Sequence, residues 1–192
     1  MNSAKPILIY GASEFGKVVK DLAEQCGFHF LGFVDDWNAG SDILGPWSKV
    51  KDRFPHGSVA IALAVGYRHM AARLALFRQL TNDGYSLPAL IHPRAYVRDP
   101  SCIGAGSLIM ASAVVDTYVQ IGPLCVLWPG AVVNHDSQIG TNCFVSPNAT
   151  ICGAVMVGES CFIGASAVVV DHNDVPAGSF VKAGTVYYLK KP

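Results

Sequence analysis

Charge is scarce in this sequence. Charged residues make up 15% of the chain, and 14 basic residues balance 14 acidic ones. A chain without net charge is not drawn to nucleic acid or to an anionic membrane surface, so we expect neither partner. Hydrophobic residues reach 51%, yet no uninterrupted apolar run approaches the roughly 20 residues of a transmembrane helix. The polar start, residues 1–6, leads straight into an apolar segment, so we expect no secretory signal and a cytoplasmic location.

Zinc-binding spacing is also missing from the six cysteines. No two of them have the close spacing that structural zinc motifs use, and we expect no bound metal. Cys125, Cys143 and Cys161 are instead separated by equal, longer intervals. This regular spacing predicts buried, reduced thiols that act as small hydrophobic side chains.

A period of six residues dominates the second half of the chain. Every sixth residue from Val97 to Val181 is Ile, Leu or Val, and the residue four positions later is small or short, as at Ser107 and Ala113. Such a period is typical of a parallel β-helix, in which each repeat, or hexad, forms one short strand and one corner. We expect the aliphatic residues to point into a triangular prism and the small residues to fill the narrower inward positions.

Glycine marks a longer period of three hexads. Gly104, Gly122, Gly140 and Gly158 each follow an aliphatic position of the repeat, and successive glycines are three hexads apart. Three hexads therefore make one coil, with a corner that favours a residue without a Cβ atom. The repeat predicts about five coils with no inserted loop. Because the three regularly spaced cysteines have the same separation, they are predicted to stack at one inward position on successive coils.

The first half of the chain predicts a small α/β domain. Strands are predicted at residues 6–10, 28–35, 58–65 and 89–91, and helices at residues 17–26 and 68–81. Residues 37–55 are predicted to form a surface connection with room for a short helix. Strand, Gly-rich turn, helix and strand make a βαβ unit whose helix N-terminus can bind an anion. We divide the chain into a Rossmann-like domain, residues 1–92, and a β-helix domain with a C-terminal tail, residues 93–192. The tail, from Ala183, is predicted to leave the prism and cap its end.

The Gly-rich turn, Gly11 to Gly16, departs from a dinucleotide-binding fingerprint. The fingerprint Gly-x-Gly-x-x-Gly needs a middle glycine, and Ser13 stands in that place. Asp35 follows at a spacing that would suit a ribose, but the domain has about half the strands of the complete dinucleotide-binding fold. We therefore expect no NAD.

The order of motifs along the chain resembles one branch of the hexapeptide acyltransferases. The motifs are Tyr10-Gly-Ala-Ser13 with Gly16, Phe33-Val-Asp-Asp36, Ala64-Val-Gly66, Ile91-His-Pro93 and Asn134-His-Asp136. This branch contains sialic-acid O-acetyltransferase-like proteins and nucleotide-aminosugar N-acetyltransferases of bacterial glycan synthesis. The resemblance implies a left-handed parallel β-helix, which is an exception to the right-handed crossover rule. It also implies a homotrimer with active sites between neighbouring subunits.

For the first domain, the resemblance implies a site for the nucleotide of the sugar substrate. Gly11 and Ser13 would face the phosphates, and Asp35 and Asp36 would face the base. The sequence departs from the family at Glu14-Phe15, where Gly-His is common. A carboxylate near a pyrophosphate raises the electrostatic energy unless it is turned away or paired, so Glu14 weakens the nucleotide assignment.

For the second domain, His135 is the candidate general base. It stands two residues after the inward Val133, on the corner side of its coil, and an imidazole with a pKa near 6.5 suits proton removal at neutral pH. Asp136 would hold the ring in one tautomer, as a carboxylate does in a catalytic triad. The resemblance implies that the oxyanion is bound by the backbone N–H of Gly153, one coil further on. It also implies that acetyl-CoA lies along the outside of the prism, between subunits.

Two further departures change the expected acyl pocket. Phe144 stands where some relatives have a second histidine near the acyl group, and Trp128-Pro129 stands where an asparagine is common. Both changes make the pocket more apolar, which would admit a longer acyl chain or a less polar acceptor.

The sequence thus predicts an acetyl-CoA-dependent sugar acyltransferase that N-acetylates a nucleotide-linked 4-amino sugar. One alternative is O-acetylation of a sugar of the sialic-acid type, which needs no nucleotide site. Another is a non-catalytic trimeric β-helix scaffold, which would bind no coenzyme A and would not depend on the corner around His135.

Overall fold

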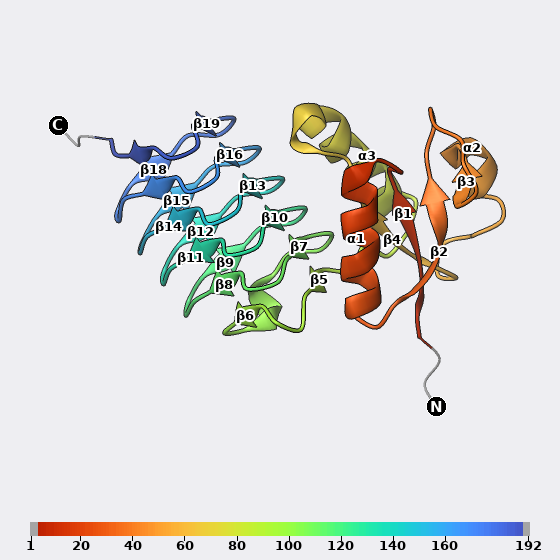
Figure 1. The fold of residues 1–192 in the computed structure, drawn as a ribbon, viewed down its shortest axis with the longest axis horizontal. Coiled ribbons are helices and arrows are strands. Elements are labelled where there is room, and N and C mark those ends of the chain that lie inside the picture. Colours follow the sequence, from red (N-terminus) through yellow and green to blue (C-terminus); the bar gives the residue numbers. More distant parts are fainter. Residues whose placement is uncertain (1–3, 190–192) are drawn as a thin grey trace. The chain divides into compact units, whose positions relative to one another are not determined.

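The chain forms two compact units, residues 1–90 and 91–192. A computed structural model describes residues 4–189, and Figure 1 shows their fold. The first unit is an α/β domain and the second is a stack of β-coils.

The α/β unit is built on a four-stranded parallel sheet with the strand order β3-β2-β1-β4. Its strands are β1 (Pro6–Tyr10), β2 (His29–Val34), β3 (Ile43–Gly45) and β4 (Ala60–Leu63), and its helices are α1 (Glu14–Gln25), α2 (Trp47–Val50), the 3-10 turn η1 (Tyr67–His69) and α3 (Met70–Asn82). All four residues of β4 are buried, so both faces of this strand lie against the core, as is usual in a parallel sheet.

Helix α1 begins three residues earlier than predicted. Ser13 has extended backbone angles and is the N-cap, and its carbonyl accepts the first helical hydrogen bond, from Lys17 N at 3.2 Å. The helix therefore starts inside the Gly-rich turn, and its unpaired N–H groups follow Ser13 directly.

Two strand predictions for this unit were wrong. The segment 37–55, predicted as a connection, contains the edge strand β3, which pairs with β2. The short strand near residue 90, β5 (Leu90–Ile91), joins a sheet of the solenoid beside β7 instead of the α/β sheet. The reason is that Ile91 lies one hexad before Val97, so the six-residue period already includes it, and His92 N donates to Ile109 O at 2.9 Å.

The second unit is a parallel β-helix of two-residue strands arranged in three sheets, whose stacked coils are visible in Figure 1. The first sheet contains β5, β7 (Leu108–Ile109), β10 (Val126–Leu127), β13 (Phe144–Val145), β16 (Phe162–Ile163) and β19 (Phe180–Val181). The second contains β6 (Tyr96–Val97), β8 (Val114–Val115), β11 (Val132–Val133), β14 (Thr150–Ile151), β17 (Val168–Val169) and β20 (Val186–Tyr187). The prediction that the tail leaves the prism from Ala183 was wrong, because β20 continues the stack by pairing with β17. The third contains β9 (Gln120–Ile121), β12 (Gln138–Ile139), β15 (Met156–Val157) and β18 (Asp174–Val175), and a 3-10 turn, η2 (Pro100–Cys102), precedes it.

The register between coils is three hexads throughout. Val133, for example, pairs with Val115 on one side and Ile151 on the other. The predicted inward positions are confirmed: from Ile103 to Val181, every aliphatic residue of the repeat is buried. The small positions four residues later in the central coils, such as Ala131 and Ala149, are buried as well, so the coils interlock without inserted loops.

The stacked cysteines act as thiol donors inside the prism. Cys125 Sγ donates to Gly140 O, and Cys143 Sγ donates to Gly158 O, both at 3.1 Å. The hydrogen bond with Cys125, together with burial, raises the pKa of Cys143 to about 12. These thiols therefore stay protonated and fill space, as the sequence predicts.

The glycines that recur once per coil leave room for the neighbouring coil, which makes Gly140→Ala a test of coil packing. A Cβ atom on Gly140 would lie 2.8 Å from Glu159 N and from the carbonyl carbon of Gly158, both backbone atoms. Because backbone cannot yield as a side chain does, we expect Gly140→Ala to lower the free energy of unfolding by about 1–3 kcal/mol. Urea unfolding followed by circular dichroism would measure the change. Gly66→Ala is the control, because a Cβ there meets no atom within 4 Å, and equal stability of the two variants would contradict the packing argument.

Candidate active site

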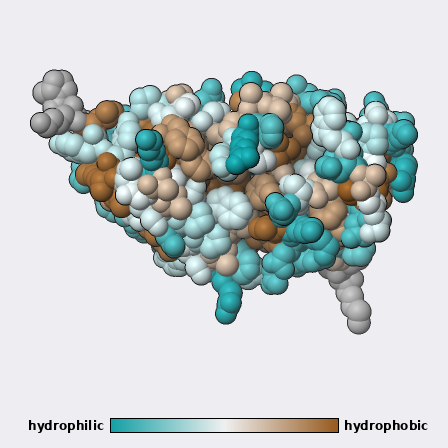
Figure 2. Space-filling view, turned by 45° about the horizontal axis from the view of Figure 1, so that its top comes forward, coloured by the Kyte–Doolittle hydropathy of each residue, from teal (hydrophilic) through white to brown (hydrophobic). Residues whose placement is uncertain are grey.

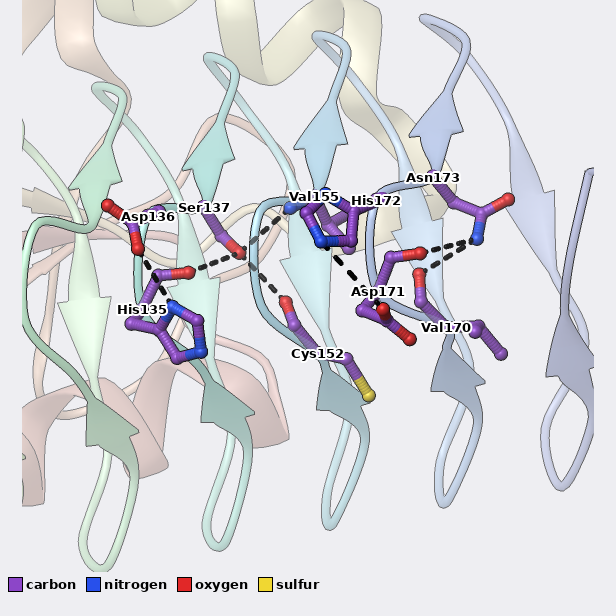
Figure 3. Close-up of polar contacts among 9 residues, drawn as sticks. All are labelled: His135, Asp136, Ser137, Cys152, Val155, Val170, Asp171, His172 and Asn173. Atoms are coloured by element: carbon purple, nitrogen blue, oxygen red, sulfur yellow. Dashed lines mark hydrogen bonds and ion pairs between the residues drawn. The ribbon is translucent and has the colours of Figure 1, made fainter. Parts of the chain in front are cut away.

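His135 and Asp136 lie at the corner between β11 and β12 (Figure 3). The corner is fixed to the next coil by two backbone hydrogen bonds, from Asn134 N to Ile151 O and from Ala154 N to His135 O, each at 2.9 Å. The two side chains are 57% and 56% exposed. The corner therefore presents them to solvent on a rigid backbone.

The structure brings the two side chains together. His135 Nδ1 lies 2.8 Å from Asp136 Oδ2. Asp136 has a φ of 58°, in the left-handed region that Asp tolerates better than most residues. When Nδ1 carries the proton and donates it to the carboxylate, the neutral ring has its lone pair on Nε2. The pair thus has the geometry of a general base with a fixed tautomer.

Gly153 lies on the next coil, directly against the imidazole. A Cβ atom on Gly153 would be 2.6 Å from His135 Cε1 and 2.7 Å from Nε2. Only glycine leaves room for the ring in this position. Among residues 4–189, no group accepts a hydrogen bond from the Gly153 N–H. The corner therefore combines an outward imidazole with an unused backbone donor.

Phe144 behaves differently from the other predicted residues of this domain. Its side chain is only 2% exposed, so the single chain does not present the ring to solvent. Its contact with an acyl group stays a prediction.

The α/β unit holds a cavity of about 720 Å³ at the ends of β1 and β2. Gly11, Asp35 and Asp36 line it, as do Tyr10 and Trp37, which the sequence did not single out. Ser13 is the exposed N-cap of α1 and does not line the cavity. Trp37 is 94% exposed. Its position directly after the paired aspartates could have identified it from the sequence as a residue of the cavity.

The Gly-rich turn is tight for steric reasons. A Cβ on Gly11 would lie 2.7 Å from Ala64 O, and one on Gly16 would lie 2.2 Å from Gly11 O. Gly11 also has a φ of 110°, which favours glycine. Glu14 is exposed at the first position of α1, where a negative charge interacts favourably with the helix dipole. Glu14 therefore already interacts with the positive end of the helix dipole, which would otherwise favour an anionic ligand.

Asp35 serves the turn and the following loop. Its Oδ2 accepts from Ala12 N at 2.9 Å, and its Oδ1 accepts from Trp37 N, Asn38 N and Asn38 Nδ2. Burial alone would raise the pKa of Asp35, but these hydrogen bonds lower it below its ordinary value of 3.8. The carboxylate thus ties the Gly-rich turn to the loop that carries Trp37.

Asp36 is held from two other elements. Tyr10 Oη donates to its Oδ2 at 2.5 Å, and Trp47 N donates to its Oδ1 at 2.9 Å. Burial, together with this hydrogen bond, raises the pKa of Tyr10. Each oxygen of Asp36 keeps a lone pair, so Asp36 can still accept from a ligand in the cavity.

The lowered pKa of Asp35 gives a stability prediction with a defined sign. A carboxylate with a lower pKa in the folded state stabilises the protein above its unfolded pKa, and this contribution is lost as the pH falls through the folded pKa. We expect Asp35→Asn to reduce the free energy of unfolding by about 1–3 kcal/mol at pH 7 and by less at pH 3. Urea titrations at both pH values would measure this. Asp52→Asn, an exposed change in the same unit, should have little effect, and a deficit of Asp35→Asn that is independent of pH would contradict the prediction.

Metal clusters and membrane-spanning helices are both absent from residues 4–189. These residues contain no group of three or more His, Cys, Asp or Glu side chains that could hold a metal ion. No helix within them has the length and hydrophobicity needed to cross a bilayer.

Family comparisons agree with both units of the fold. Residues 6–80 match the PglD N-terminal domain, and residues 118–153 and 136–171 match the bacterial transferase hexapeptide family. The stack of coils is therefore a left-handed β-helix of hexapeptide repeats, as predicted.

Solved structures of similar proteins cover nearly the whole chain. The acetyltransferase domain of PglB from Neisseria gonorrhoeae FA1090 is 30% identical, with a TM-score of 0.90 over 98% of this chain and 93% of that one. The same domain in complex with acetyl coenzyme A gives 27% identity and a TM-score of 0.78 over 97% and 100% of the two chains. A variant of perosamine N-acetyltransferase from Caulobacter crescentus, in complex with CoA and GDP-perosamine, gives 25% identity and a TM-score of 0.77 over 92% and 93%. The chain belongs to the hexapeptide-repeat sugar acyltransferases.

Proposed function

We propose that the protein transfers the acetyl group of acetyl-CoA to the amino group of a nucleotide-linked 4-amino sugar. The observation that carries this proposal is the corner at which the His135–Asp136 pair packs against Gly153. Two similar proteins support the substrate class, because one was solved with acetyl coenzyme A and the other with CoA and GDP-perosamine. In this proposal residues 1–92 bind the nucleotide sugar and residues 93–192 carry the transferase chemistry.

The proposed reaction is a direct attack on the thioester. The lone pair of the neutral amine forms a C–N bond with the carbonyl carbon, and the carbonyl electrons move to oxygen. His135 Nε2 takes one proton from the nitrogen, while the Gly153 N–H donates to the oxyanion. The oxyanion then collapses, the C–S bond breaks, and the thiolate takes the proton from the imidazolium. The products are the acetamido sugar and free CoA, with no covalent enzyme intermediate.

Asp136 contributes by stabilising the imidazolium that forms in this step. Its carboxylate accepts from Nδ1, so the positive charge on the ring has a partner 2.8 Å away. The same contact keeps the lone pair of the resting base on Nε2, the nitrogen beside Gly153.

The nucleotide would occupy the cavity of the α/β unit. Gly11 and the start of α1 after Ser13 would face the phosphates. Asp36 would accept from the base, whereas Asp35, which already accepts four hydrogen bonds, would hold the loop. Trp37, exposed and on the cavity wall, offers an aromatic face on which a base could stack.

A homotrimer is part of this proposal, and the outward residues of one sheet support it. The second sheet of the solenoid presents a mostly apolar ladder of Tyr96, Val114, Val132, Thr150, Val168 and Val186, in which Thr150 and Tyr96 carry hydroxyl groups. Figure 2 shows hydrophobic patches between hydrophilic ones on the molecular surface. The ladder runs along β11, and the His135 corner follows β11 directly. A subunit packed on this ladder would therefore border the proposed acetyl-CoA site.

O-acetylation of a sugar without a nucleotide is the second candidate, and Glu14 favours it. Its carboxylate lies at the N-terminus of α1, where a pyrophosphate would otherwise bind. A hydroxyl acceptor needs the same base and the same oxyanion donor. The two candidates therefore differ in the α/β unit and share the corner.

The proposal is tested by thiol release from acetyl-CoA with a panel of acceptors. The panel contains nucleotide-linked 4-amino sugars, free amino sugars and sialic acid. We expect turnover with a nucleotide-linked amino sugar and little with its free sugar. Turnover with sialic acid alone would establish the O-acetyl candidate instead. Failure to bind coenzyme A in a thermal-shift assay, with no turnover, would favour a non-catalytic scaffold.

A further inference from the structure

Ser137 follows the His135–Asp136 pair and points into the prism (Figure 3). Its side chain is fully buried. The inward positions on this corner, each three hexads from the next, are Val119, Ser137, Val155 and Asn173. One coil before Val119 the same repeat position is Ser101, which is exposed. Among the buried positions of this ladder within residues 4–189, a hydroxyl therefore occurs only at the coil that carries His135.

The hydroxyl of Ser137 lies in a chain of hydrogen bonds. Val155 N donates to Ser137 Oγ at 3.1 Å, and Ser137 Oγ donates to Cys152 O at 2.8 Å. His135 O is a more distant acceptor, at 3.4 Å. Because the hydroxyl has one proton, the shorter contact defines its direction. The Cys152 carbonyl and the Gly153 N–H are the two ends of one peptide group.

We propose that Ser137 is a positioning residue that orients and polarises the Cys152–Gly153 peptide, so that its N–H binds the reaction's oxyanion more strongly. The inference rests on the proposed function, because it needs Gly153 as the oxyanion donor. Electron withdrawal at the carbonyl end of an amide makes its N–H a better donor, and hydrogen bonds in a chain strengthen one another. The bond from Val155 N to Ser137 strengthens the hydroxyl as a donor in the same way. The charge on the oxyanion is thereby shared with groups inside the prism.

Packing alone does not require this hydroxyl. Val119 and Val155 fill the same inward position on the coils before and after, and both are buried without a polar side-chain group. A valine would therefore suit the stack at Ser137. The serine instead places a buried polar group beside the peptide that faces His135, where it needs partners and has them.

The same hydrogen-bond pattern recurs at Ser107, which provides a matched control. Ser107 Oγ donates to Gly122 O at 3.1 Å and accepts from Cys125 N at 2.9 Å. Ser107 lies on a different corner of the prism, away from His135 in the repeat. Ser107→Ala and Ser137→Ala therefore remove the same bonds, and only the second touches the proposed oxyanion site.

The test compares Ser137→Ala with Ser107→Ala in the full chain. We expect Ser137→Ala to lower kcat for acetyl transfer by about tenfold, which corresponds to one hydrogen bond, with KM for acetyl-CoA unchanged. The pH dependence of kcat should not move, because the base is not altered. Ser107→Ala should keep the wild-type kcat, and both variants should show a similar loss of thermal stability.

Two further measurements separate positioning from packing. Ser137→Cys should recover part of kcat, because the thiols of Cys125 and Cys143 make the same type of bond to a carbonyl at 3.1 Å. In spectra of selectively ¹⁵N-glycine-labelled protein, the Gly153 amide proton should shift upfield in Ser137→Ala and stay unchanged in Ser107→Ala.

Each outcome bears on the inference or on the function beneath it. If the wild type is active and depends on His135 but Ser137→Ala matches Ser107→Ala, the inference is overturned and the proposed function stands. A shifted pH profile would also overturn it, because Ser137 would then act on the base. An unmoved Gly153 resonance would exclude polarisation of the peptide. A wild type that turns over no acceptor would overturn both.

Discussion

We expect His135→Ala to lower kcat for acetyl transfer by about 10²–10⁴-fold, the range for removal of a general base. The imidazole is the group whose Nε2 lies beside Gly153, and its other nitrogen is held by Asp136 at 2.8 Å. Without the ring, the proton of the attacking amine must pass to water, which is a weaker base. Thiol release under saturating acetyl-CoA and acceptor would measure the loss.

His172→Ala is the matched control for this measurement. His172 is also exposed, on the same row of corners two coils from Asp136, and its Nε2 lies 3.9 Å from Asp171 Oδ2. Like His135, His172 has an aspartate next to it in the sequence. Among the described residues, however, no glycine packs against the His172 ring. We expect its kcat to stay within about twofold of wild type, in keeping with an exposed side chain outside the chemistry. Equal losses in the two variants would remove the basis for choosing His135.

The second large effect is expected for Gly153→Ala. The new methyl group would lie within 2.7 Å of two atoms of the His135 ring, so the ring must leave its position. Since a displacement of about 1 Å can cost 10²-fold in rate, we expect a loss of kcat of about that size. The folded structure should persist, because the obstruction is one exposed side chain.

A double-mutant cycle identifies the clash as the cause. Alone, Gly153→Ala should lower the free energy of unfolding by about 0.5–1 kcal/mol, less than Gly140→Ala, because the exposed imidazole can move away from the new methyl group. In the His135→Ala background the same change should cost close to zero, because the obstructing ring is absent. Urea unfolding of the four proteins supplies the cycle. Additive costs would mean that the methyl group meets the backbone and not the imidazole.

The solenoid was predictable because one physical signal repeats in it. Each coil buries the same aliphatic positions, so the period of six residues records the fold many times over. The same period would have assigned Ile91 to the solenoid, but the apolar run at residues 89–91 also fits a strand of the α/β sheet. The edge strand β3 had no such signal, because its three residues pair only with β2 inside a polar segment.

The sequence could nominate candidate site residues, but it could not predict the contacts that those residues make. Adjacent side chains such as those of His135 and Asp136 often diverge, and here they meet because Asp136 takes a left-handed backbone conformation. Asp35 and Asp36 look equivalent in the sequence, yet Asp35 bonds to the Gly-rich turn and the following loop, whereas Asp36 bonds to Tyr10 and Trp47 N. These differences depend on how the loop after β2 folds back, which is a tertiary property.

Because the register is three hexads throughout, equivalent positions on successive coils are evenly spaced along the solenoid axis. Successive coils are about 4.8 Å apart along the axis, the spacing of hydrogen-bonded strands. The separation of any two equivalent corner positions along the axis, such as those on the coils of His135 and Gly153, is therefore a whole number of coil spacings. A deletion or insertion of one whole coil shifts all later coils by one coil spacing along the axis, and each side chain on them keeps its orientation. The length of the proposed acetyl-CoA site along the prism can thus change during evolution by whole coil spacings, while the corner that carries His135 keeps its geometry.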